Sequence, residues 1–343
     1  MSLRAIARIL GVSSTTVSLA LKNSPRVSPE VSARIKNLAK AAGYVPNAKL
    51  AELMNEVRKA ASSTYHGTLG IFSLYPQQEP WRDHPHLDIL RKHAAICAQS
   101  HGYQLEYFWY KEPHLTPERF RAILDARHIQ GLFCLGSANP EENFPPQLQN
   151  LAVVTFAASI PSKLHRVASH FMADATFLFD QLLTRGYRRP GLVMLNHGDR
   201  RTAHAYSATY LSVVERKVPA ASGIPVLRSD HWDEPAFEAW FTAHRPDVIV
   251  LHQDPSYITG VEKCLRRHGL TVPRRIGLAL LDKNPNPTRF SGICQSMPRM
   301  ASTAIEMLIG RILMRDFSAP AYPKVELVIG DWNEGRTLAR RRA

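Results

Sequence analysis

Hydrophobic positions divide the chain into a short N-terminal part with helical spacing and a longer part in which strand-like and helix-like runs alternate. The first helix is predicted from apolar residues at i, i+3, i+4 and i+7, which are Leu3, Ile6, Ala7 and Leu10. Gly11 ends this helix, because glycine readily adopts the left-handed conformation of a helix C-terminus. Ser13 or Ser14 can then cap a second helix, whose inner face is Val17, Ala20 and Leu21.

A third helix is predicted after a turn, with Ser28 as its N-cap and Pro29 as its first residue. Its apolar stripe is Val31, Ile35, Leu38 and Ala42, and Gly43 closes it. Two short helices joined by a tight turn with glycine form either a helix-turn-helix, whose second helix enters a DNA major groove, or an ordinary αα-hairpin. Periodicity alone leaves both readings open.

The outer face of the second helix favours the DNA-binding alternative. Its side chains are small and carry hydroxyl groups, in contrast to the Lys/Glu face of a solvated helix: Ser14, Thr15, Thr16 and Ser18. Such side chains can approach base edges and phosphates closely.

From Thr68 onward the pattern changes to alternating strands and helices. Short apolar runs predict strands at 68–74, 105–110, 131–135, 151–156, 191–195, 246–251 and 276–281. Helical spacing predicts helices at 86–102, 120–126, 173–185, 202–217, 257–268 and 299–314. This alternation indicates parallel βαβ units. The pattern restarts near residue 161, which predicts two α/β lobes with a ligand cleft at the carboxyl ends of their strands.

Charge is concentrated at the N-terminus. The formal net charge is +14, and residues 1–60 carry half of it, with ten Lys/Arg against three acidic residues. A compact basic module suits phosphate binding, because counterions are released when it binds DNA. With 343 residues and 45% hydrophobic content, the chain is long enough for two or three ordinary globular domains.

Several other classes of protein do not fit the sequence. Four cysteines lie far apart, at Cys97, Cys134, Cys264 and Cys294, and suggest neither a disulfide framework nor a zinc site. We see no signal peptide and no transmembrane run, so a cytoplasmic protein without a membrane partner is expected. Fifteen histidines form no metal-ligand pattern, and no catalytic motif is present, so we expect no metal, no cofactor and no enzyme.

The first fifty residues resemble the LacI family of bacterial transcription regulators. The motifs that carry the resemblance are Leu-Arg-Ala-Ile-Ala-Arg-Ile-Leu-Gly-Val-Ser, Thr-Val-Ser-Leu-Ala-Leu, Asn-Ser-Pro-Arg-Val-Ser-Pro-Glu and Ala-Gly-Tyr-Val-Pro-Asn. The resemblance implies an all-α three-helix DNA-binding headpiece over 1–46 and a hinge helix with linker over 47–60. It also implies a dimerisation and effector-binding core over 66–343, an α/β structure of two Rossmann-like lobes of the periplasmic-binding-protein-like type I.

The same resemblance assigns DNA contacts. They are Ser2, Leu3, Ser13, Ser14, Thr15, Thr16, Ser18, Asn23, Arg26, Val27, Tyr44, Asn47, Leu50, Leu53 and Met54. By position Leu53 is the wedge that enters the minor groove, although a plain connecting helix is the alternative and Glu52 and Glu56 make this segment less basic than expected. Leu19 stands where family members usually carry an arginine, so the bidentate contact of arginine with guanine is not available there and the usual operator is not expected.

Cleft residues follow from the resemblance in the same way. Asp282 comes at the end of a predicted strand, where the family places an aspartate that accepts hydrogen bonds from effector hydroxyls. Trp81 could stack on a sugar ring or simply pack in its loop. The further candidates are Tyr75, His170, Tyr206, Gln253 and Asp254, of which His170 and Tyr206 replace an aspartate and an arginine of many relatives.

Taken together, these features predict a sequence-specific DNA-binding transcription regulator, a repressor that binds a palindromic operator as a homodimer. A small-molecule effector, a sugar or a related metabolite, is expected in the cleft. The alternative is a solute-binding sensor or carrier whose N-terminal hairpin does not read DNA, and the missing export signal argues against it.

Overall fold

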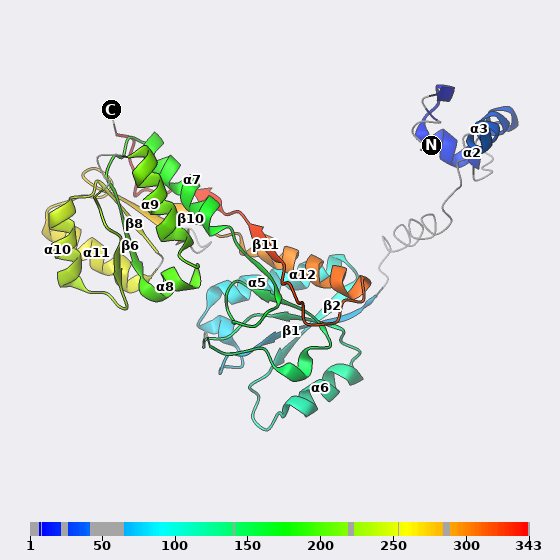
Figure 1. Cartoon of the computed structure of the whole chain (residues 1–343), viewed down its shortest axis with the longest axis horizontal. Coiled ribbons are helices and arrows are strands. Elements are labelled where there is room, and N and C mark those ends of the chain that lie inside the picture. The colour runs from blue at the N-terminus through cyan, green and yellow to red at the C-terminus, as the bar shows by residue number, and fades with distance from the viewer. Residues whose placement is uncertain are drawn as a thin grey trace. The chain divides into compact units, whose positions relative to one another are not determined.

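The computed structural model describes residues 7, 9–21, 27–41, 65–139, 141–218, 223–252, 254–283 and 289–341 (Figure 1). The chain forms two compact units, residues 1–64 and residues 65–343. In the described ranges there is no helix with the length and apolar content needed to cross a bilayer.

The N-terminal unit contains the second and third predicted helices, α2 (Ser14–Leu21) and α3 (Pro29–Ala41). Val17, Ala20 and Ile35 of the predicted inner faces are confirmed, because they are buried with Ala7 and Ala39 in a small core, against which Val31 and Leu38 pack. The predictions for Leu21 and Ala42 are not tested. Ser13 rather than Ser14 is the N-cap of α2, since its hydroxyl accepts a hydrogen bond from the Thr16 amide at 3.0 Å. Gly11 has a φ of +65°, the left-handed conformation that its place after the preceding helical residues requires.

The larger unit is built on two six-stranded sheets. The first has the order β11-β5-β4-β3-β1-β2, and all its pairings are parallel. Its strands are β1 (Gly67–Ser73), β2 (Tyr103–Trp109), β3 (Gly131–Cys134), β4 (Ala152–Phe156), β5 (His165–Ser169) and β11 (Val325–Val328). The second has the order β12-β10-β9-β8-β6-β7, in which only the β10–β12 pairing is antiparallel. Its strands are β6 (Pro190–Leu195), β7 (Leu227–Ser229), β8 (Val248–Leu251), β9 (Gly277–Lys283), β10 (Ser291–Cys294) and β12 (Asp331–Asn333).

Helices cover both faces of each sheet, as buried parallel strands require. Successive residues along each strand of the first sheet point to opposite faces of the sheet. Ile71 and Phe133 pack with α5 (Pro85–Ser100) and α12 (Met297–Leu313), whereas Phe72 packs with α6 (Pro117–Ala126). In Figure 1, the strands of the second sheet run between one pair of helices, α7 (Phe171–Thr184) and α9 (Ala205–Lys217), and another, α10 (Glu234–His244) and α11 (Pro255–Arg267). The shorter helices are α8 (Asn196–Arg201), η1 (Pro80–Arg82) and η2 (Pro146–Leu148).

The prediction of two consecutive lobes that divide near residue 161 is wrong, because the chain passes between the sheets three times. It first leaves the first sheet after β5, at His170. It returns at 295–296, so that α12 lies on the first sheet beside α5 (Figure 1). It crosses again at 329–330, between β11 and β12. The physical reason is that the apolar face of α12 packs on the first sheet, so that both apolar surfaces are buried.

The single helix predicted over 202–217 is also wrong. It is two helices, because Ala203 and His204 adopt left-handed φ values of 50° and 60° and separate α8 from α9. The break lets three side chains surround the buried carboxylate of Asp199. These donors are His204 Nδ1 at 3.1 Å, Ser207 Oγ at 3.1 Å and Arg228 Nε at 2.8 Å.

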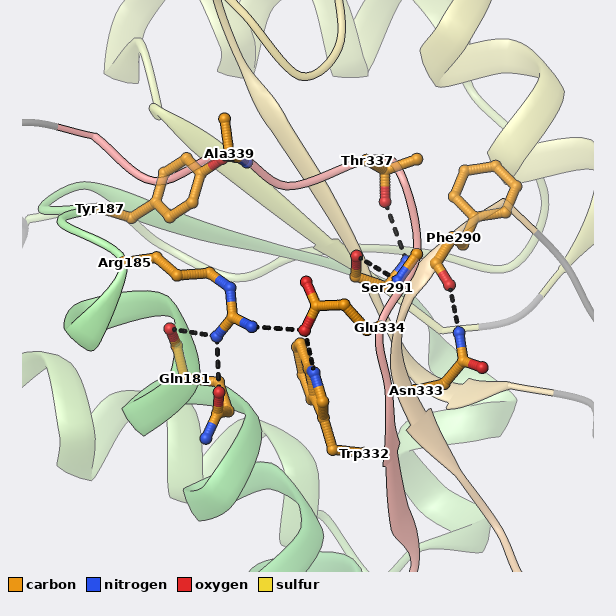
Figure 2. A network of polar contacts seen from close by, with 11 residues as sticks. Gln181, Arg185, Tyr187, Phe290, Ser291, Trp332, Asn333, Glu334, Thr337 and Ala339 are labelled. Carbon is orange, nitrogen blue, oxygen red and sulfur yellow. Dashed lines mark hydrogen bonds and ion pairs between the residues drawn. The ribbon is translucent and has the colours of Figure 1, made fainter.

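The C-terminal segment is packed on the second lobe as far as Arg341. Thr337 is buried, and its hydroxyl donates to the Leu278 carbonyl at 2.6 Å and accepts from the Ser291 amide at 3.0 Å. The Ala339 amide donates to the Tyr187 hydroxyl at 3.0 Å. Figure 2 shows this segment beside a second set of contacts, in which Arg185 bridges Gln181 and Glu334.

Replacing Thr337 with valine should lower the free energy of unfolding. The substitution keeps the side-chain shape but leaves the buried Ser291 amide without its acceptor, a loss of about 1–3 kcal/mol. Chemical denaturation of the full chain measures the effect. Thr337→Ser, which keeps the hydroxyl, is the matched control, and equal midpoints for the valine variant and the native chain would contradict the account.

Candidate functional site

The start of α2 holds residues with hydroxyl side chains that were predicted to contact DNA, and Ser13, which precedes the helix, is exposed. The Ser13 and Thr16 hydroxyls lie 2.8 Å apart, so the cap and the next turn of the helix are joined. Ser14, Thr15 and Ser18 also lie on α2. Val27 is half-buried and packs against the core between α2 and α3.

Other predicted contacts lie outside the described residues. They are Ser2, Leu3, Asn23, Arg26, Tyr44, Asn47, the proposed hinge residues Leu50, Leu53 and Met54, and Gln253 of the effector set.

The larger unit contains a cavity of about 310 Å³ to which both lobes contribute. It lies where β4, β6, β8 and β9 end, which is the edge where parallel sheets bind ligands. Its lining residues are His86, Phe156, Ala157, Ala158, Phe171, His197, Gly198, Arg201, Thr202, His252, Asp282, Gln295 and Met297.

An ion pair between His252 and Asp282 lies in the wall of this cavity. His252 directly follows β8, and Asp282 is the penultimate residue of the neighbouring strand β9. His252 Nε2 is 3.0 Å from Asp282 Oδ2. Burial lowers the pKa of His252, but the charge and hydrogen bond of Asp282, helped by Asp254, outweigh it and raise this pKa above its usual value. The protonated ring is therefore favoured. Within the described residues, His252 Nδ1 is buried and has no hydrogen-bond partner.

Two further histidines of the cavity are held in the neutral form. Burial, together with the charges of His84 and Arg201, lowers the pKa of His86 to about 4. Burial also lowers the pKa of His197, with His252 and Arg201 adding to the effect. Both rings are therefore uncharged near pH 7.

Arg201 ends α8 and brings a positive charge to the cavity. Its side chain is exposed, and among the described residues its guanidinium forms no hydrogen bond or ion pair. The helix that carries it is held in place by the contacts of the neighbouring buried Asp199. The arginine therefore projects from a fixed backbone with its charged group available.

Of the described effector candidates, Asp282 lines the cavity. Trp81 does not: its ring packs edge-on against Tyr107 at 4.8 Å and lies under the guanidinium of Arg91 at 4.4 Å, which is the packing alternative. Tyr75 is also outside the lining, buried with its ring 5.2 Å from that of His84.

The other three candidates have structural contacts and lie outside the lining. His170 Nδ1 accepts from the Ala173 amide at 3.3 Å and caps α7. Asp254 caps α11 by accepting from the Ser256 amide at 2.9 Å. Tyr206 is fully buried behind the wall, where its hydroxyl accepts from Gln295 Nε2 at 3.3 Å. Burial raises the pKa of Tyr206 well above its usual value.

Sequence reasoning missed most of the polar lining: His86, His197, Arg201, Thr202, His252 and Gln295. A signal existed for two of them, because His197 and His252 follow β6 and β8 by one or two residues, just as Asp282 lies near the end of β9. Within the described part of the chain there is no group of three or more His, Cys, Asp or Glu side chains that could hold a metal ion.

Replacing Asp282 with asparagine should bring the pKa of His252 below its usual value of about 6.5, because burial then dominates. A histidine-selective NMR titration of the two proteins measures this pKa. The pKa of His252 is higher in the folded protein than in the unfolded chain, so the ion pair increases the free energy of unfolding. This contribution is complete below the unfolded-state pKa of about 6.5 and is lost as the pH rises through the folded-state pKa. An unchanged pKa of His252 in the variant would show that Asp282 does not determine the protonation of the His252 ring.

Two family models match the chain. The model described as "Bacterial regulatory proteins, lacI family" matches residues 2–47, and the model described as "Periplasmic binding protein-like domain" matches residues 179–337. Together they cover more than half of the chain. No curated protein sequence matches it.

Solved structures of similar fold include a complex of the transcriptional regulator CelR with cellobiose, at 16% identity and a TM-score of 0.55, covering 98% of this chain and 99% of that one. The lac repressor dimer bound to operator and the anti-inducer ONPF has 14% identity, a TM-score of 0.54 and 99% coverage of both chains. A periplasmic binding protein/LacI transcriptional regulator from Alkaliphilus metalliredigens QYMF, complexed with D-xylulofuranose, has 16% identity and a TM-score of 0.53 over 79% of this chain and 99% of that one.

At these identities the structural likeness shows the fold, and it confirms the predicted combination of a LacI-type headpiece with a core of two periplasmic-binding-protein-like lobes. The function class follows from the N-terminal match, which is to regulatory proteins and not to enzymes. The chain thus matches the LacI family of bacterial transcription regulators over residues 2–47 and the periplasmic-binding-protein-like domain over residues 179–337.

Proposed function

We propose that the protein is a dimeric repressor that binds a palindromic operator and responds to a small polyhydroxylated effector in its cleft. The proposal rests on one observation: the same chain contains a segment that matches the lacI-type headpiece and a core with a ligand-sized cavity at its strand ends. The proposed site of action is the cytoplasm, where the DNA is.

For DNA binding we propose a headpiece over 1–46, a hinge over 47–60 and a core over 66–343. The hydroxyl side chains of α2 read base edges in the major groove, and Leu53 is the minor-groove wedge. The net charge of the first sixty residues supports phosphate contact. A dimer is supported by the related lac repressor, whose structure is a dimer on its operator, and by the match between a two-fold protein axis and a palindrome.

For the effector we propose that Asp282 accepts and Gln295 donates hydrogen bonds to a ligand with several polar groups. The two related complexes with cellobiose and D-xylulofuranose support a carbohydrate-like molecule. Because the cavity is lined from both lobes, a ligand that fits one lobe arrangement better than another shifts the equilibrium between them. That shift is the proposed route from the cleft to the operator.

Selection from a random DNA pool should enrich a two-fold symmetric sequence with the full chain. Its affinity should fall steeply as salt rises, because counterions are released on binding. The second compact unit alone, residues 65–343, is the matched control and should enrich nothing. No enrichment by the full chain, or equal enrichment by residues 65–343, would contradict a DNA-reading headpiece.

A thermal-shift screen of sugars, sugar phosphates and nucleobases should find a ligand that stabilises the core. Asp282→Ala should weaken that ligand by about tenfold or more, because hydrogen bonds to a charged group are lost. Asp180→Ala, which removes a carboxylate that pairs with Lys217 in the same lobe, should leave the affinity unchanged. Full affinity in Asp282→Ala would place the ligand elsewhere.

A further inference from the structure

We infer that the ligand of the cleft carries an oxyanion, a carboxylate or a phosphate group, and that Arg201 binds it. This inference rests on the proposed function, since it concerns the ligand of the same cleft.

Positively charged and titratable basic side chains outnumber carboxylates in the lining of the cavity. Among the described lining residues, Asp282 is the single carboxylate, and it is already engaged by His252 at 3.0 Å. Arg201 is a full positive charge, and three histidines stand with it. Among the described lining residues, this balance leaves the arginine without a carboxylate partner.

Within the described part of the chain, Arg201 lines the cavity without a carboxylate partner, unlike three other arginines of the second lobe. Arg185 pairs with Glu334 at 2.6 Å, Arg228 pairs with Asp199 at 2.8 Å, and Arg267 pairs with Glu238 at 2.7 Å. Arg201 has no such carboxylate among the described residues. Its planar guanidinium suits two parallel hydrogen bonds to a carboxylate or phosphate.

Two neutral histidines line the cavity together with Arg201. His86 lies in the first turn of α5, where it faces His84 of the preceding segment, the Phe156 ring and the Arg201 charge. His197 faces His252, Asp254 and two arginines, Arg200 and Arg201. A negative charge bound at Arg201 therefore raises the pKa of both rings, although burial still opposes their protonation.

The sign of the pH dependence follows. In the empty cleft the pKa values of His86 and His197 lie below the usual value, and an oxyanion at Arg201 raises both. The complex then binds more protons than the free protein. The affinity for the oxyanion therefore rises as the pH falls from 7 toward 5. A neutral sugar lacks this effect, because it leaves the charge of Arg201 in place.

The test uses the full chain with labelled histidines and two probes, sulfate and acetate. Sulfate stands for a phosphate group without titrating between pH 5 and 7, and acetate stands for a carboxylate. The NMR signals of His86 and His197 should shift saturably with at least one probe, more strongly at low pH, whereas chloride of equal ionic strength has no such effect. The probe that binds more tightly identifies the source of the oxyanion.

Arg201→Gln should weaken this binding by about tenfold or more, since a charge-assisted pair is removed. Arg201 is exposed, so the variant keeps the fold. Arg200→Gln removes a neighbouring exposed arginine that does not line the cavity, and is the matched control that should retain most of the affinity. Signals that stay unmoved by both probes, or shift equally in Arg201→Gln and the native chain, would overturn the inference.

Failure of this inference is distinguishable from failure of the proposed function. Suppose that a neutral sugar binds in the cleft, that its affinity depends on Asp282, and that its binding is not accompanied by proton uptake. This result would overturn the inference of an oxyanion ligand and would leave the proposal of an effector-controlled regulator intact. If the full chain enriched no DNA sequence, the proposed regulator function would be overturned, and the result with sulfate or acetate would be unaffected.

Discussion

Three passages of the chain between two parallel sheets determine where everything else in the larger unit lies. A parallel sheet needs helices on both faces, and the first sheet obtains one of its covers, α12, from a distant part of the chain. The crossings at His170, 295–296 and 329–330 therefore join the lobes at one side. The strand ends then face each other across the cavity, which is why it collects side chains from both lobes.

Within that cavity, two electrostatic arrangements coexist. Asp282 raises the pKa of His252 and favours its protonated form, whereas burial, helped by His84 and Arg201, lowers the pKa of His86 to about 4. Two histidines of one cavity thus have pKa values shifted in opposite directions, because a carboxylate outweighs burial at the first and burial dominates at the second.

The sequence predicted elements with strong local signals and missed those without them. The Ser28–Pro29 start of α3 and the wholly apolar β3 were visible, whereas β5 and β11 were not, because polar residues interrupt the first and the second is an exposed edge strand. Asp282, which the resemblance predicted at the end of a strand, lines the cavity, and His252 also follows a strand but was not predicted. Tyr206 was placed in the cleft by the resemblance, but it is buried outside the lining, on α9 just after the left-handed residues Ala203 and His204.

The central claim is that the cleft and the headpiece are energetically coupled in one regulator. The most direct measurement is the affinity of the full chain for its selected DNA with and without a ligand that binds in the cleft, together with the affinity for that ligand with and without the DNA. The account predicts the same factor in both directions, on the order of 5- to 150-fold, and its loss when Asp282→Ala abolishes ligand binding. A ligand that occupies the cleft and leaves the DNA affinity unchanged would contradict it.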